Sequence, residues 1–124
     1  MEKEIWENPY KLEHSDKPKQ INHIENIMNW IETHYTEDFK LDNLSKDLYF
    51  STYYLSHIFK KVTGISITRY LASRRIRQAC LLLKTTNLSI EQIGQNVGLT
   101  NYPYFCQLFK KIVGTTPKNY RINA

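Results

Sequence analysis

The sequence YLSHIFKKVTG at residues 54–64 returns as YFCQLFKKIVG at residues 104–114. Tyrosine, phenylalanine, two lysines and glycine occupy the same places in both copies, at a constant offset of 50 residues. A second pair of blocks precedes them, LDNLSKDLYFS at 41–51 and IEQIGQNVGLT at 90–100, at an offset of 49. The chain therefore contains one structural unit used twice, with one residue gained or lost just before Tyr104 in the second copy.

The first copy has the pattern of a helix-turn-helix unit. Leucines at 41, 44 and 48 recur at helical spacing and predict a short helix. Ser51 is a candidate N-cap for a second helix, and Gly64 is a candidate residue with positive φ at its end. That helix would turn four apolar residues inward, namely Leu55, Ile58, Phe59 and Val62. A short helix, a tight turn and a longer helix with a polar outer face together favour helix-turn-helix architecture.

The second copy is better provided with caps and turn residues. Ser89 and Gln92 form a predicted capping box, whereas Lys40, at the place that matches Ser89, cannot cap. Gly98 suits a turn that needs positive φ, and Tyr49 at the matching place should be slightly strained. We therefore expect the first unit to be the looser one. The helix capped by Asn101 would turn inward Phe105, Leu108, Phe109 and Ile112.

Three further segments surround the two units. Residues 1–20 are polar, contain two prolines and show no periodicity, so we expect a flexible tail or linker. From Ile21 the apolar positions recur every three or four residues and predict a helix that ends near Thr36, with Trp30 off its stripe and free to cover the neighbouring lobe. Ser66 can cap a helix that runs to about Lys84, roughly 27 Å long at 1.5 Å per residue. The expected organisation is a first subdomain at 21–64, a linker helix at 65–85 and a second subdomain at 86–124.

Positive charge is concentrated in the repeated part of the chain. Residues 1–39 carry four Lys or Arg and nine Asp or Glu, whereas the remainder carries thirteen Lys or Arg and three acids. Such a density of positive charge on compact helical units favours a polyanionic partner. Nucleic acid is a better candidate than a membrane, because no amphipathic surface helix rich in Lys, Trp and Leu is evident.

Several classes of function are disfavoured. Cys80 and Cys106 lie in no CxxC pair and near no histidine at ligand spacing, so we expect no metal site. No nucleophile, base and acid stand at a known catalytic spacing, so we expect neither an enzyme nor a cofactor, nor a small-molecule ligand in this domain. No apolar run reaches the length of a membrane span, and Met1 is followed by charged residues, which favours a cytoplasmic protein.

Residues 75–121 read RIRQACLLLKTTNLSIEQIGQNVGLTNYPYFCQLFKKIVGTTPKNYR and closely resemble the signature of the AraC/XylS family of bacterial transcription regulators. The first unit, YLSHIFKKVTGISITRYLASRRI, resembles the other half of the family's domain. The resemblance covers roughly residues 21–123. Its motifs, FKK-x-x-G twice and a terminal P-x-x-Y-R, are highly specific in combination.

The resemblance implies an all-α, duplicated, homeodomain-like domain of about seven helices. Its two helix-turn-helix units would enter successive major grooves on one face of promoter or operator DNA, with RNA polymerase as a further partner. We expect either a stand-alone regulator controlled by its amount, or the C-terminal part of a longer chain with an upstream sensor or receiver domain. It also implies a bacterial, nucleoid-associated protein. Independently, a linker near 27 Å plus the width of the lobes can place two recognition helices about 34 Å apart, one turn of the duplex.

The family's contacts can be carried over by position. The residues that would face bases are Thr52, Tyr53, Ser56, His57, Asn101, Tyr102 and Gln107. Those that would contact phosphates are Ser51, Lys60, Lys61, Arg74, Thr100, Lys110 and Lys111. Many family members carry arginine where His57 and Gln107 stand, so we expect reduced dependence on guanine here.

Two other kinds of partner are compatible with the sequence. The fold could serve as a protein-interaction module for RNA polymerase or another regulator, with weakened DNA binding; its affinity for duplexes would then hardly depend on salt. Single-stranded RNA binding would need exposed stacking aromatics, for which only Tyr53 and Tyr102 qualify.

Overall fold

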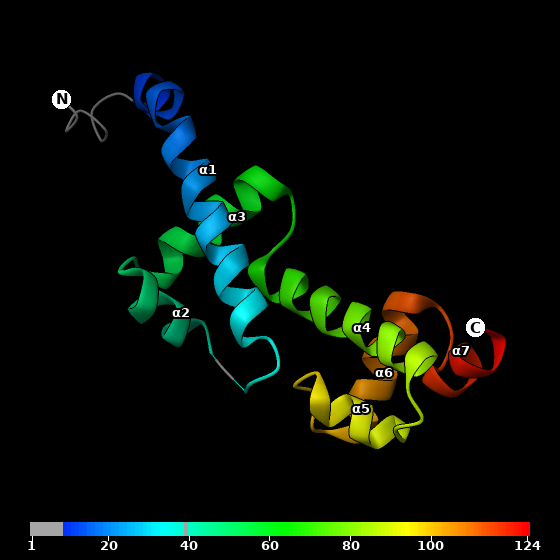
Figure 1. Cartoon of the computed structure of the whole chain (residues 1–124). Helices are drawn as coiled ribbons and strands as arrows, with labels where there is room; N and C mark the ends of the chain where they lie inside the picture. The colour runs from blue at the N-terminus through cyan, green and yellow to red at the C-terminus, as the bar shows by residue number, and fades with distance from the viewer. Residues whose placement is uncertain (1–8, 39) are drawn as a thin grey trace.

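The computed structural model describes residues 9–38 and 40–124, which form seven α-helices and no strand. Helices α1, α2 and α3 form one lobe, α5, α6 and α7 form the other, and α4 runs between them (Figure 1). The expected all-α fold of about seven helices is confirmed. The helices are α1 Pro9–His34, α2 Leu41–Leu48, α3 Thr52–Thr63, α4 Ile67–Thr85, α5 Ile90–Asn96, α6 Tyr102–Val113 and α7 Pro117–Asn123.

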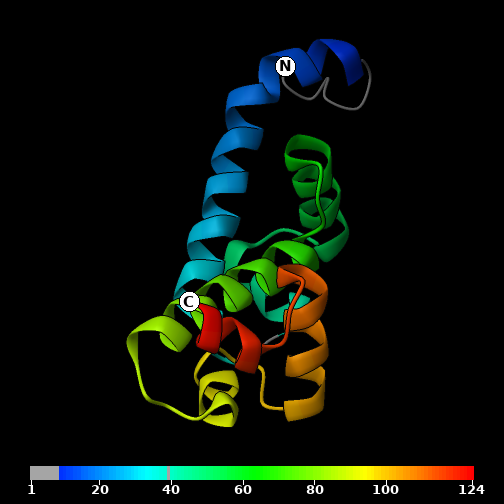
Figure 2. The same cartoon turned by 90° about the vertical axis from the view of Figure 1, so that its right-hand side faces the viewer.

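Helix α1 begins well before the residue that the apolar pattern indicated. It starts at Pro9 rather than Ile21, so residues 9–20, expected to be a flexible tail, are helical, while residues 1–8 lie outside the described part of the chain. Apolar periodicity marks the face of a helix that packs, and a helix can continue beyond its packed part on backbone hydrogen bonds alone. Figure 2 shows the first part of α1 projecting past the other helices.

The core of the first lobe joins α1 to both helices of the first unit. Its centre comprises Ile27, Ile31 and Phe59, each with no exposed surface. Trp30 belongs to this core: its side chain is 8% exposed, and its indole N–H donates to Asp47 at 2.7 Å. The expectation that Trp30 covers the neighbouring lobe is therefore wrong, because the indole N–H finds its acceptor on α2 of the same lobe.

The second lobe has a separate core, and α4 contributes to both. Ile67, at the start of α4, packs in the first core, whereas the second core contains Ile76, Ala79, Leu83, Ile93, Val97, Leu99, Phe105 and Phe109. Val62 and Ile112, both expected inside, are 44% and 42% exposed. They lie in the last turns of α3 and α6, where each helix extends beyond its core.

The predicted caps form as expected. The Ser51 hydroxyl accepts from the backbone N–H of Tyr54, and Ser89 and Gln92 form a complete capping box. Lys40 precedes α2 without a side-chain cap. The turn residue of the first unit, Tyr49, has φ 61°, and its counterpart Gly98 has φ 87°. The first unit therefore carries the strain predicted for it, since a side chain at positive φ is disfavoured.

Candidate nucleic-acid interface

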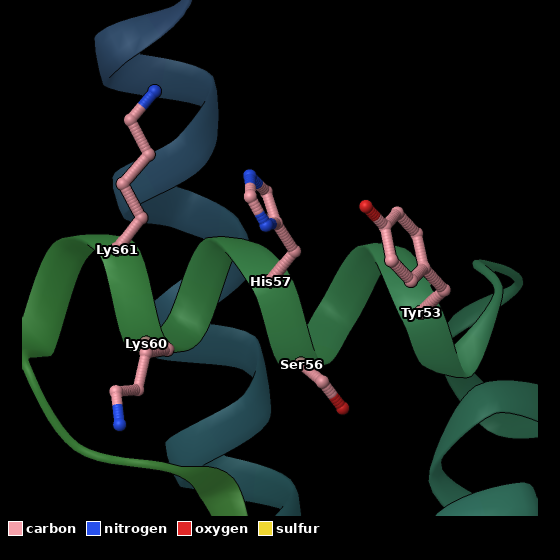
Figure 3. Close-up of a pocket in the computed structure, with 5 residues that line it drawn as sticks. All are labelled: Tyr53, Ser56, His57, Lys60 and Lys61. Atoms are coloured by element: carbon pink, nitrogen blue, oxygen red, sulfur yellow. The ribbon is translucent and has the colours of Figure 1, made fainter.

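The outward face of α3 brings together five of the predicted contact residues. Tyr53, Ser56, His57, Lys60 and Lys61 line a shallow, open depression along the helix (Figure 3). The rings of Tyr53 and His57 are stacked, with centroids 5.8 Å apart and planes 12° from parallel. This face therefore combines two planar groups, a hydroxyl and two cations.

The opposite face of α3 holds this array in place. Leu55, Ile58 and Phe59 are at most 2% exposed and anchor the helix to the core of the first lobe. Tyr53, by contrast, is 78% exposed. The repeat of inward and outward residues along α3 thus presents polar groups on a rigid support.

Two further predicted residues lie at the start of α3. Ser51 is exposed and Thr52 is half-buried. The Ser51 hydroxyl oxygen accepts the Tyr54 N–H at 3.0 Å. A hydroxyl can donate while it accepts, so capping leaves the Ser51 proton available to a phosphate oxygen.

The outward face of α6 presents the matching residues of the second unit. Gln107, Lys110 and Lys111 are exposed, and Thr100 is exposed in the turn before the helix. Gln107 stands where α3 has His57, and the two lysines stand where α3 has Lys60 and Lys61, at the repeat offset of 50. The two lysines are thus common to both faces, while the residue beside them differs.

Asn101 serves as the cap of α6. Its side-chain oxygen accepts the Tyr104 N–H at 3.0 Å. A bidentate pairing of Asn101 with adenine would need both the oxygen and the NH₂ of this amide. In the capped conformation the oxygen already accepts one hydrogen bond from the helix, whereas both N–H donors of the amide remain available to a base.

Tyr102 interacts with Cys106 one turn further along α6. A hydrogen bond with Cys106 raises the pKa of the Tyr102 phenol, and the charge of Cys106 and slight burial act in the same direction. Tyr102 is 42% exposed and neutral at physiological pH, so its hydroxyl can donate or accept. This contact and the stack of Tyr53 on His57 are not among the features predicted from the sequence, although both pairs have the i, i+4 spacing that makes helical side chains neighbours.

Arg74 lies apart from the two outward faces, in the contact between α4 and α1. Its Nε and Nη2 each donate to the Glu32 carboxylate at 2.8 Å, and its guanidinium lies 4.2 Å from the centre of the Tyr35 ring. This hydrogen bond raises the pKa of Arg74 and lowers that of Glu32. Glu32 thus engages two of the five N–H donors of Arg74 and offsets its charge.

Two further kinds of site are absent from the described residues. No helix there is long and apolar enough to cross a membrane. Over the same part of the chain, no group of three or more His, Cys, Asp or Glu residues could hold a metal ion.

Comparison with known proteins shows the family to which this chain belongs. Residues 44–123 match the protein family described as a helix-turn-helix domain. Together with the repeated units and the linker helix, this match shows that the chain belongs to the AraC/XylS family of transcription regulators and contains its DNA-binding domain. The family is one of regulators that use a helix-turn-helix to bind DNA.

Individual proteins similar to this chain are also regulators or domains of regulators. The arabinose operon regulatory protein of Escherichia coli K12 is 33% identical over 105 residues, which cover 84% of this chain and 36% of that protein. The C-terminal domain of the response regulator yesN from Fusobacterium nucleatum is 44% identical, with a TM-score of 0.77 over 81% of this chain and 98% of that one. The C-terminal domain of AraT, a response regulator from Geobacillus stearothermophilus, is 32% identical, with a TM-score of 0.80 over 82% and 85%.

The chain spans only part of several of these relatives. It covers 36% of the arabinose regulator, 32% of the regulatory protein PocR of Salmonella typhimurium and 51% of AdaA of Bacillus subtilis.

Proposed function

We propose that this chain binds double-stranded promoter or operator DNA sequence-specifically and regulates transcription, with α3 and α6 as two recognition helices in successive major grooves. The observation that carries the proposal is the matched pair of outward faces. Each is exposed, polar and backed by a buried core, and each carries two lysines at the same places of the repeat.

The length of α4 suits this arrangement. Its 19 residues span roughly 28 Å at 1.5 Å per residue. Recognition helices on one side of a duplex enter successive major grooves about 34 Å apart. The linker and the half-width of each lobe together can supply that separation.

The chemistry of the side chains suggests their roles. The proposed base contacts are Thr52, Tyr53, Ser56, His57, Asn101, Tyr102 and Gln107. The proposed phosphate contacts are Ser51, Lys60, Lys61, Thr100, Lys110, Lys111 and Arg74, whose charge is partly offset by Glu32. Lysine ammonium groups suit phosphates as point charges, whereas amide, imidazole and hydroxyl groups can read the edges of bases.

His57 and Gln107 bear on base preference. Neither can offer the bidentate fork by which arginine binds guanine. We propose that base recognition at these two places depends little on guanine and that phosphate contacts supply much of the affinity.

Salt dependence tests the proposal against a protein-interaction module. The protein is titrated into duplexes selected by it from a random library, and into unrelated duplexes, at several salt concentrations. Four lysine contacts predict a slope of log K against log salt of about −4, and selected duplexes should bind at least about a thousandfold more tightly than unrelated ones. A slope near zero with no selected sequence would refute DNA binding as the function.

Two partners are proposed on the strength of the relatives. AdaA of Bacillus subtilis is described as a transcriptional activator, and yesN and AraT as response regulators. By analogy we propose RNA polymerase as a partner of the bound protein, and control by a sensor or receiver domain. Binding to chromosomal DNA would place the protein at the bacterial nucleoid.

A further inference from the structure

The two lobes meet directly beside the linker helix α4. The backbone carbonyl of Tyr35, just after α1, contacts Gly98, which lies in the turn between α5 and α6: a Cβ built on Gly98 would lie 2.5 Å from that oxygen. Residues 35 and 98 belong to different lobes, and four helices, α2 to α5, separate them along the chain. Their contact therefore restricts how one lobe can rotate against the other.

Arg75, on α4, completes this junction. Its Nε donates to the carbonyl oxygen of Tyr35 at 2.7 Å, and its Nη2 donates to the carbonyl oxygen of Glu37 at 2.7 Å. The same side chain lies against Gly98, because the added Cβ would be 3.0 Å from its Nε. One guanidinium thus ties the end of α1 to the linker helix beside the turn of the second unit.

Electrostatics and packing support the junction. Burial lowers the pKa of the Arg75 guanidinium, and Asp38 and Tyr104 partly offset the effect by favouring its charged form. Tyr104 belongs to the first turn of α6, so the charge of Arg75 acts on both lobes. Tyr35 is itself 9% exposed, which gives Arg75 an ordered acceptor.

The first unit provides an internal comparison for Gly98. Tyr49 occupies the same turn with a similar positive φ, and its side chain is 90% exposed. This turn can therefore accept a side chain in spite of its backbone conformation. Position 98 requires glycine for a further reason: the neighbouring Tyr35 carbonyl and Arg75 leave no room for a Cβ.

We propose that Arg75, Gly98 and the Tyr35 carbonyl form a lock that fixes the angle and separation of the two recognition helices, and so sets the spacing between the two half-sites that the protein accepts. The inference rests on the proposed binding of two successive grooves. One added base pair shifts the second half-site by 3.4 Å and rotates it by about 35° around the duplex. A protein whose lobes are held at a fixed angle and separation cannot reach the displaced half-site. A protein whose lobes can rotate against each other can reach it.

The first measurement needs no DNA. Spin labels are attached at Lys46→Cys on α2 and Lys118→Cys on α7, both exposed, in a Cys80→Ala, Cys106→Ala background. We expect a narrow distance distribution for this parent, and a broader or displaced one after Gly98→Asn or after Arg75→Met. Tyr49→Asn, at the matched turn of the first unit, should leave the distribution unchanged. Circular dichroism checks that each variant keeps its helices.

The second measurement compares DNA spacings. Duplexes selected by the parent are lengthened or shortened by one base pair between the half-sites. The parent should lose about tenfold or more in affinity, as for a mismatched base pair, whereas Gly98→Asn and Arg75→Met should lose less than about threefold while keeping the parent's preference at each half-site.

Folded variants that keep the parental distance distribution and the parental spacing preference would overturn the lock. If the parent itself shows no preference for spacing, binding to two grooves is refuted instead, while the label distances still decide whether the junction holds the lobes.

Discussion

Tyr49 and Gly98 occupy the same turn of the two repeats under different constraints. Both have positive φ, at 61° and 87°. Tyr49 projects into solvent, whereas Gly98 lies against a backbone carbonyl of the other lobe. The sequence predicts glycine at position 98 because of its backbone conformation. The structure adds a steric reason, since the carbonyl of Tyr35 leaves no room for a side chain there.

The residues of the outward faces should separate into two classes when changed singly. Lys60→Ala or Lys110→Ala should weaken binding to all duplexes alike and reduce the salt slope by about 1, because each removes one phosphate contact. His57→Ala or Gln107→Ala should alter base preference and leave the slope nearly unchanged. Fluorescence anisotropy over a salt series measures both quantities. A strong requirement for guanine that disappears in His57→Ala or Gln107→Ala would contradict the roles assigned to them.

The ion pair of Glu32 with Arg74 predicts a small, pH-dependent contribution to stability. The pKa of Glu32 in the folded state lies below its ordinary value of 4.5, chiefly because of the hydrogen bond from Arg74. The contribution is therefore present above that pH and is lost as the pH falls through the lowered pKa. Because the Glu32 side chain is 58% exposed, solvent screening limits the effect to less than about 1 kcal/mol.

Thermal unfolding of Glu32→Gln at several pH values tests this. The variant should be slightly less stable than the parent near neutral pH, and the difference should vanish in acid. Glu25→Gln, an exposed change on the same helix, serves as the control. A difference that stays constant through the acid range would show that the charge of Glu32 is not its cause.

At the scale of the helices, the two units differ in how their first helices begin. Helix α5 starts with a capping box, whereas α2 starts after Lys40 with no side-chain cap. A missing cap costs about 1 kcal/mol, and the unsatisfied amides of the first turn favour fraying. The inequality is local and could be predicted from the residues alone.

Amide hydrogen exchange should consequently be faster in residues 41–62 than in 90–112. Lys40→Ser should slow exchange in the first turn of α2 and stabilise the protein by about 0.5–1 kcal/mol, because residue 40 already has the extended conformation of an N-cap. Lys46→Ser, within the same helix, should give no such gain. Slower exchange in 41–62 than in 90–112 would contradict the ranking.

The molecule as a whole has two cores that share the linker helix. Ile67 of α4 packs in one, and Ile76, Ala79 and Leu83 pack in the other. Phe59 in the first core, and Phe105 and Phe109 in the second, are the largest side chains with no exposed surface. Stability should therefore divide between the lobes, with α4 and the junction at Gly98 joining them.

Truncation of either phenylalanine should loosen mainly its own lobe. Phe59→Ala and Phe109→Ala are each expected to cost about 3–5 kcal/mol. Hydrogen exchange should show lost protection in 24–67 for the first and in 76–109 for the second. Equal loss across the chain in both variants would show instead that the lobes unfold as one unit.

Features that depend on near neighbours were predictable from the residues. The repeated blocks, the caps at Ser51 and Ser89 and the turns at Tyr49 and Gly98 follow from interactions within a few positions, because capping and φ preference are local. The candidate contact faces of α3 and α6 were predictable for the same reason, since helical periodicity separates buried from outward residues.

Packing between distant segments decided the remainder. Trp30 bonds to Asp47, Arg74 binds Glu32 rather than standing free for phosphate, and α1 continues back to Pro9 beyond its packed face. Arg75 finds its acceptor 40 residues away, at the carbonyl of Tyr35, beside a glycine of the other lobe. The contact of Arg75 with Tyr35 and Gly98 cannot be predicted from residue spacing. It forms only when the two separate cores have fixed both ends of the linker helix.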